Sequence, residues 1–203
     1  MFTIDSFDIF EIDGLDERMA AIRANIQPVF QSIGEQVTES LADELCEKLL
    51  IHIAQHRRRT TYAPESTWVA FGGNKRGYKK FPHFELTIND QYIGMWLSFI
   101  DNPEFEKEIA QIFIDNQSLI RHLGDDFVVS LDHTQPTFHQ LSTLDLNQAL
   151  ERWRDVKKGE FMVGRIINKT DAIMNNTQAM YTTMLETYQS LIPLYQLAYS
   201  VRS

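Results

Sequence analysis

The sequence predicts an α+β fold, organised as a single domain over residues 1–203 with a mainly antiparallel sheet flanked by helices and a helical C-terminus. Near both ends of the chain, apolar residues recur at steps of three and four, which is the helical period. The middle of the chain changes to a period of two, which is typical of strands. No Pro/Gly/Ser-rich linker divides the 203 residues, of which 43% are hydrophobic, so one shared core is expected.

The first quarter of the chain is predicted to hold a short strand and two helices. Residues 7–12 are largely apolar with imperfect alternation, which favours a strand. A helical stripe runs from Leu15 to Ile33, with a kink or restart expected at Pro28 because proline removes a hydrogen bond from a helix interior. Gly34 is the expected stop, and a second stripe predicts a helix from Val37 to about His56.

The centre of the chain is predicted to form strands. Residues 67–71 are rich in β-formers. The run from His83 to Ile88 alternates between polar and apolar side chains, as in a strand with two different faces. After an Asn-Asp turn, the run from Tyr92 to Ile100 is apolar on both faces, which is typical of a central strand covered on both sides.

The second half of the chain is predicted to alternate between helices and strands. Asn102 is placed to cap a helix whose first residue is Pro103 and which ends near Gly124. The patterns that follow predict a strand over 127–131, a helix over 146–156, a strand over 161–167 and a long C-terminal helix from about 174 onward.

Composition limits the partners that this chain could have. The formal net charge of −9 argues against a nucleic-acid binder with a uniformly basic surface. The single cysteine, Cys46, allows no intramolecular disulfide, and the N-terminal residues lack the basic start of a secretory signal. The longest nearly apolar run is less than half of the roughly 20 residues of a membrane span. We therefore expect a cytoplasmic protein that makes no membrane contact.

The charges are segregated along the sequence. Residues 51–84 contain seven Lys or Arg and one acid, a local charge of +6, whereas the rest of the chain carries −15. Such a segment, with aromatic residues among the cations and glycines nearby, is typical of a surface that binds phosphates and stacks bases. The ordinary alternative is a solvated helix end and a solubilising hairpin tip. With a second basic stretch near residue 160, the predicted ligand-binding residues are Arg57, Arg58, Arg59, Trp68, Lys75, Arg76, Tyr78, Lys79, Lys80, Lys157, Lys158 and Arg165.

Catalytic motifs are scarce. Gly72 and Gly77 have the glycine spacing of a P-loop, but Tyr78 stands where its lysine is required. His83 and Glu85 are expected on the same face of one strand, where they could transfer protons, although a structural contact is the commoner role of such a pair. These two residues are the weak catalytic candidates, and no metal or cofactor is expected.

Three blocks of the sequence resemble the YktB-like proteins, a family of bacterial cytosolic proteins without an assigned function. The blocks are Phe7–Pro28, His56–Phe84 and Val156–Phe161, and the middle one, with its Asn74-Lys75-Arg76-Gly77-Tyr78-Lys79 run, is the most distinctive. The lead into Trp68 at Tyr62-Ala63-Pro64 departs from the expected pattern. The resemblance implies one α+β domain and supplies no catalytic residue or cofactor.

Three functions stay open on these residues. The first is binding of a phosphate-bearing ligand, either single-stranded nucleic acid or a nucleotide, in a basic groove. The second is a small enzyme that acts on a phosphorylated metabolite with His83 and Glu85 as its acid/base pair. The third is a protein–protein interaction module that uses the Tyr- and Met-rich C-terminal helix. Whether the chain is an enzyme, and its oligomeric state, are not determined by the sequence.

Overall fold

The computed structural model describes residues 1–202 and confirms the α+β class. Seven strands form one sheet in the order β1-β2-β3-β4-β7-β5-β6, and every neighbouring pair is antiparallel. The predicted central strand is β4, which is buried along its whole length. The strands are β1 (Ile51–Ile53), β2 (Ser66–Gly72), β3 (His83–Asn89), β4 (Tyr92–Phe99), β5 (Val128–Ser130), β6 (His139–Gln140) and β7 (Phe161–Asn168).

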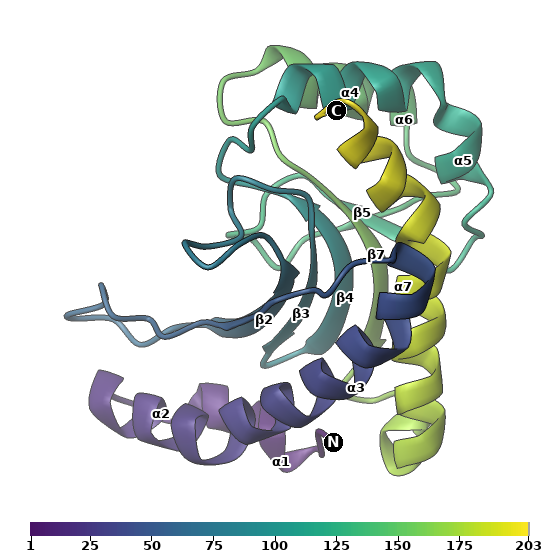
Figure 1. Ribbon diagram of the computed structural model, residues 1–203. Coiled ribbons are helices and arrows are strands. Elements are labelled where there is room, and N and C mark those ends of the chain that lie inside the picture. Colours follow the sequence, from purple (N-terminus) through teal and green to yellow (C-terminus); the bar gives the residue numbers. More distant parts are fainter. Residues whose placement is uncertain (203) are drawn as a thin grey trace.

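Helices cover one face of this sheet and close its ends. In Figure 1, α3 and α7 lie along one face, α4 and α6 pack together near the C-terminal end of α7, and the N-terminal helices lie at the opposite end of the sheet. The helices are α1 (Asp5–Asp8), α2 (Leu15–Ala21), α3 (Gln27–Leu45), α4 (Glu106–Asp115), α5 (Gln117–Arg121), α6 (Leu146–Asp155) and α7 (Thr177–Ser200), with short 3-10 segments at Ile9–Glu11 and Ala172–Asn175 and a π-helical turn at Ile22–Ile26. None of these helices combines the length and apolarity needed to cross a membrane.

Alternation along the strands gives the sheet two different faces. Phe84, Leu86 and Ile88 are fully buried on the face that packs against α3 and α7, which we call the covered face. Their neighbours in β3 point to the other side, which we call the open face. The apolar stripe of α7 also enters the core, where Phe84 stacks on Tyr195 at 4.8 Å between ring centroids. The apolar side chains of the C-terminal helix therefore pack within its own chain.

Two predictions for the first quarter of the chain are wrong. Residues 7–11 are helical, because Phe7 and Phe10, three residues apart, both turn into the core. So short an apolar run does not reveal its period. Gly34 lies inside α3 and is not a stop. A Cβ atom there would lie 3.0 Å from the ring of Phe71 and 3.3 Å from Ile51, so the glycine allows the helix to approach the sheet closely.

Two element boundaries also differ from the prediction. The helix expected to reach His56 ends at Leu45, and residues 51–53 pair with β2 instead, because an available strand edge outweighs a weak helical pattern. Asn102 does not cap a helix, since α4 begins at Glu106. The preceding turn contains Asp101, Asn102 and Phe105 at positive φ, a conformation that short-range capping signals do not reveal.

Candidate functional site

A cavity of about 450 Å³ opens on the open face of the sheet. Side chains of β2, β3 and β4 form its floor. The N-terminal helices, through Phe10 and Arg18, close one end together with the β3–β4 turn, and the loop after β5 forms a further wall with His133 and Pro136. Because this volume is within the range of small-molecule pockets, roughly 300–1,000 Å³, we take it as the candidate site.

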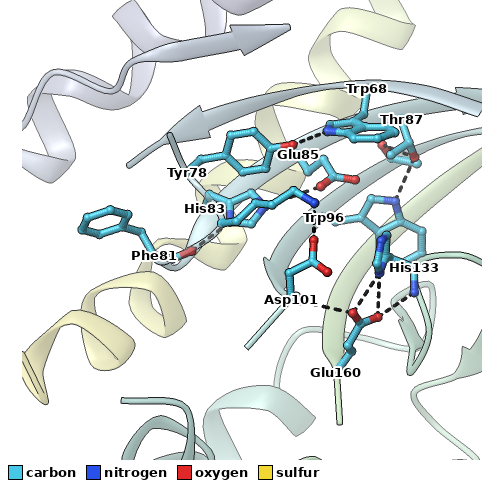
Figure 2. Close-up of polar contacts among 12 residues, drawn as sticks. Trp68, Tyr78, Phe81, His83, Glu85, Thr87, Trp96, Asp101, His133 and Glu160 are labelled. Carbon is cyan, nitrogen blue, oxygen red and sulfur yellow. Dashed lines mark hydrogen bonds and ion pairs between the residues drawn. The ribbon is translucent and has the colours of Figure 1, made fainter. Parts of the chain in front are cut away.

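Two tryptophans form the floor of the cavity, and both indole N–H groups are satisfied within the chain. Trp68 Nε1 donates to the Tyr78 hydroxyl at 2.6 Å, and Trp96 Nε1 donates to Thr87 Oγ1 at 3.1 Å (Figure 2). Only glycine fits at position 94, since a Cβ atom there would lie 2.2 Å from Trp96 Nε1. Trp68 is partly exposed and presents apolar ring surface of fixed orientation to the cavity, whereas Trp96 is only 2% exposed and is part of the packed floor.

His83 and Glu85 lie side by side on the open face of β3. His83 is fully buried and Glu85 is 3% exposed. His83 Nδ1 lies 2.8 Å from the Phe81 carbonyl oxygen, and Nε2 lies 3.5 Å from Glu85 Oε2 (Figure 2). Glu85 lines the cavity, whereas His83 lies behind it against the Tyr78 ring at 4.7 Å between centroids. Burial raises the pKa of the Tyr78 hydroxyl, which is therefore neutral at physiological pH.

A second polar cluster fixes the loop after β5. Glu160, just before β7, accepts from the His133 backbone N–H at 2.9 Å, from His133 Nδ1 at 2.8 Å and from the Asp101 N–H at 3.3 Å. Burial would raise the pKa of Glu160, but the His133 hydrogen bonds outweigh burial and lower it. The Glu160 hydrogen bond raises the pKa of His133. The result is a charged pair that holds one wall of the cavity.

The same cluster has the residue types of a cation site. Asp101, His133 and Glu160 bring one potential ligand atom each within 4.8 Å of one another. The Lys79 ammonium, however, contacts the Asp101 carboxylate, and its hydrogen bond and charge lower the pKa of Asp101 against the opposing effect of burial. Positive charge is thus already supplied here by Lys79 and His133, and these groups satisfy the carboxylates without a metal ion.

Comparison with known protein families matches residues 2–195 to a domain of unknown function, DUF1054. The chain belongs to the DUF1054 family. It is 57% identical over 198 residues to the UPF0637 protein of Enterococcus faecalis, covering 98% of both chains. It is 48% identical to a UPF0637 protein of Shouchella clausii, over 97% of this chain and 94% of that one. A relative in Oceanobacillus iheyensis is 44% identical, over 99% and 98% of the two chains. The resemblance to the YktB-like proteins is confirmed, and these names state no ligand or reaction.

The first basic segment of this DUF1054 chain is divided between the two ends of β2. Arg57, Arg58 and Arg59 lie on the β1–β2 loop, and Arg59 reaches the rim of the cavity. The other four predicted cations lie on the β2–β3 loop at the far end of the strand. There the backbone N–H groups of Asn74 and Gly77 bond to each other's carbonyl oxygens at 3.0 Å, so these amides are occupied within the loop. The four residues of this group are Lys75, Arg76, Lys79 and Lys80.

The second basic stretch does not join the cavity. Lys157 and Lys158 are exposed in the turn after α6. Arg165 pairs in register with Met95, which places it on the covered side of β7, where it forms an ion pair with Asp126 at 2.7 Å and lies over the Phe127 ring. Of the twelve predicted ligand-binding residues, Arg59 and Trp68 line the cavity; Tyr78 supports it through Trp68.

The structure adds a cavity residue that the sequence did not indicate, Arg18. Its Nε donates to the Ile12 carbonyl at 2.9 Å and its Nη1 to the Pro64 carbonyl at 3.0 Å. Arg59 Nη1 lies 3.4 Å from the carbonyl oxygens of Tyr62 and of the residue after it. Among residues 1–202, neither arginine has a carboxylate within ion-pair distance. Arg18 is one polar residue within the first predicted helix, and no local pattern distinguishes it from the other charged residues there.

Proposed function

We propose that this DUF1054 protein binds a small nucleotide-like molecule in the open-face cavity. The planar ring of the ligand stacks on Trp68, an N–H group of the ring donates to Glu85, and a phosphate faces Arg18 and Arg59. The observation that carries the proposal is that an acceptor, an aromatic floor and two arginines without carboxylate partners in the described chain line one cavity.

The aromatic floor supports a planar ligand. Stacking of a base on an aromatic side chain contributes about 1–3 kcal/mol and requires only an accessible ring face. The hydrogen bonds from Trp68 to Tyr78 and from Trp96 to Thr87 fix the two rings before a ligand arrives. Fixed rings lose little conformational entropy on binding, which favours affinity.

The arginines support an anionic group at one end of the cavity. A guanidinium has five N–H donors, and the backbone contacts of Arg18 and Arg59 use only part of them. Both side chains also hold the loop that contains Pro64, so their charges are fixed in place near the Ser66 end of β2. Arginine forks match phosphate geometry. Glu65 and Asp90 line the same cavity, but neither forms an ion pair with these two arginines.

The size of the site favours a single nucleotide over a strand of nucleic acid. The predicted cations lie at opposite ends of β2 and, for Arg165, on the covered side of the sheet. A strand would require a continuous basic track along the surface. One cavity of about 450 Å³ with two arginines at one end fits one phosphate group attached to one ring.

The proposal is tested by calorimetric titration with nucleoside monophosphates and the matching nucleosides. We expect Arg59→Gln to weaken binding of the monophosphate by about tenfold, one charge-assisted contact, and to leave the nucleoside unchanged. Glu85→Gln should weaken both ligands, because the base contact is common to them. Lys75→Gln, on the far loop, is the matched control and should change neither. Absence of binding by the whole panel, or equal losses for Arg59→Gln and Lys75→Gln, would sink the proposal.

The enzymatic hypothesis has one supporting observation: Glu85 lines the cavity and touches His83. Such a pair could move a proton to or from a bound phosphorylated metabolite. Turnover of phosphorylated small molecules that is lost in both Glu85→Gln and His83→Gln, with ligand binding retained in at least one of them, would support it. Binding without turnover leaves the first proposal in place.

A further inference from the structure

The tautomer of His83 follows from its contact with the main chain. Nδ1 lies 2.8 Å from the carbonyl oxygen of Phe81, and a carbonyl oxygen can only accept. Nδ1 therefore carries a hydrogen atom. In a neutral imidazole the other nitrogen, Nε2, would then have a lone pair and no hydrogen to donate.

That second nitrogen faces an acceptor. Nε2 lies 3.5 Å from Glu85 Oε2, and within the described chain both atoms are buried without another hydrogen-bond partner. A neutral imidazole beside an ionised carboxylate would bring two lone pairs together in a site shielded from water, where unpaired polar atoms are costly. One proton between the two groups turns this repulsive contact into an attractive one.

We infer that His83 and Glu85 share one proton, and that this proton lies on Nε2, so that both ring nitrogens donate, Nδ1 to the Phe81 carbonyl and Nε2 to Glu85. The part of this inference that concerns the ligand rests on the proposed function. An imidazolium behind Glu85 keeps the carboxylate ionised, so Glu85 accepts from ligand N–H groups and donates none. His83 is then a positioning residue that makes Glu85 an acceptor and not a donor of hydrogen bonds. The expected ligand is a neutral ring that presents an N–H or amino group.

The other charged and titratable groups near Glu85 are neutral or paired with other residues. Asp101 is neutralised by Lys79, and His133 is paired with Glu160. Burial lowers the pKa of His52, which is therefore neutral at physiological pH. Tyr78 packs on the His83 ring as a neutral phenol, and from the covered face the Tyr188 hydroxyl donates only to the Glu85 backbone carbonyl, at 3.0 Å. The charge of Glu85 helps to raise the pKa of His133, but the hydrogen bonds of His133 go to Glu160, and none of these neighbours forms an ion pair with Glu85.

Nitrogen NMR of the ligand-free protein tests the pair directly. With ¹⁵N-labelled histidine at pH 7, we expect both His83 ring nitrogens to carry hydrogen in the wild type. In Glu85→Gln the side-chain amide can donate to Nε2, so His83 should become the neutral tautomer with hydrogen on Nδ1 alone. Glu65→Gln is the matched control, because it removes another carboxylate of the same cavity that has no histidine contact, and it should leave the His83 signals unchanged. His83→Gln assigns the signals.

The outcomes separate this inference from the proposed function. An unprotonated Nε2 in the wild type, with the same His83 signals in Glu85→Gln, would overturn the proton-sharing pair whatever the protein binds. A protonated pair that responds to Glu85→Gln alone supports it even if no nucleotide binds. Where ligands do bind, a series of rings with and without an N–H donor should show about a tenfold preference for the donor, and an equal affinity for both would refute the role given to Glu85.

Discussion

The two faces of the sheet are built from alternating residues of the same strands, yet they differ in what fills them. On the covered face of β3, Phe84, Leu86 and Ile88 meet other hydrocarbon side chains in one continuous core. On the open face, His83 and Glu85 are almost as deeply buried, but they are polar and meet one another beside a cavity. Burial alone therefore does not separate the structural face from the face with binding potential.

The difference lies in how polar groups are satisfied. The covered face has little polar surface to pair, so its stability comes from packing. The open face depends on particular partners, such as the pair of Trp96 with Thr87 and the pair of His133 with Glu160. Residues of the first kind should affect stability when they are truncated, and residues of the second kind should affect the cavity and its dependence on pH.

The largest expected effect is the loss of a covered-face ring. Phe84→Ala removes a fully buried side chain that stacks on Tyr195, and it should lower the free energy of unfolding by about 3–5 kcal/mol. Phe138→Ala is the open-face counterpart. Its ring is only partly buried and contacts Tyr92 at 5.7 Å between centroids, so the loss should be about half as large or less. Urea unfolding of the two variants measures the contrast, and equal losses would mean that the two faces contribute equally to stability.

An intermediate effect is expected from pH through the His133–Glu160 pair. The pKa of His133 is raised, so its contribution is complete below the ordinary histidine value near 6.5 and is lost as pH rises through the folded-state pKa. The pKa of Glu160 is lowered, so its contribution is complete above the ordinary glutamate value near 4.3 and is lost as pH falls through the folded-state pKa. The pair should therefore stabilise the fold most between about pH 5 and pH 6.

The variant His133→Gln isolates that contribution, because glutamine can donate a hydrogen bond but carries no charge. The difference in unfolding free energy between wild type and variant should be greatest in that window, about 1–3 kcal/mol, and should shrink toward pH 9. His139→Gln alters an exposed histidine and is the control. A wild-type advantage that does not change with pH would show that the pair acts through its neutral hydrogen bond alone.

The smallest expected effect is the loss of one hydroxyl from the floor of the cavity. Thr87→Val keeps the shape of the side chain but removes the acceptor of the Trp96 indole N–H, which lies 3.1 Å away. Because the cavity can admit water to this group, the cost should be only about 1 kcal/mol by urea unfolding. A loss as large as that of Phe84→Ala would contradict the view that the open face contributes less to stability.

Local patterns predicted the sheet strands well where the period was clean. The alternation of His83 to Ile88 placed those side chains on two faces, and the apolar run that became β4 marked the centre of the sheet. The residues of β1 were assigned to a helix because Ile53 continues the helical stripe that begins at Val37, and three residues are too few to show the period of a strand. Only their pairing with β2, distant in sequence, decides their conformation.

The candidate site was predictable in part. The sequence indicated Trp68, Arg59 and the pair of His83 with Glu85, since these belong to a basic, aromatic segment or to one strand. It did not indicate Arg18, His133 or Glu160, because the contacts that place them join segments that are 27 to 59 residues apart. No spacing rule links such residues, and their meeting depends on how the N-terminal helices and the loop after β5 close around the open face.

By itself, the sequence determined the α+β class, the central strand and the segregation of charge, because period and composition are local properties of the chain. Only the tertiary structure decided which cations share a surface. The strand β2 separates its two basic flanks, and the register of β7 turns Arg165 toward the covered side. Proximity in sequence concentrates charge along the chain, but strand direction and side-chain alternation determine where that charge points.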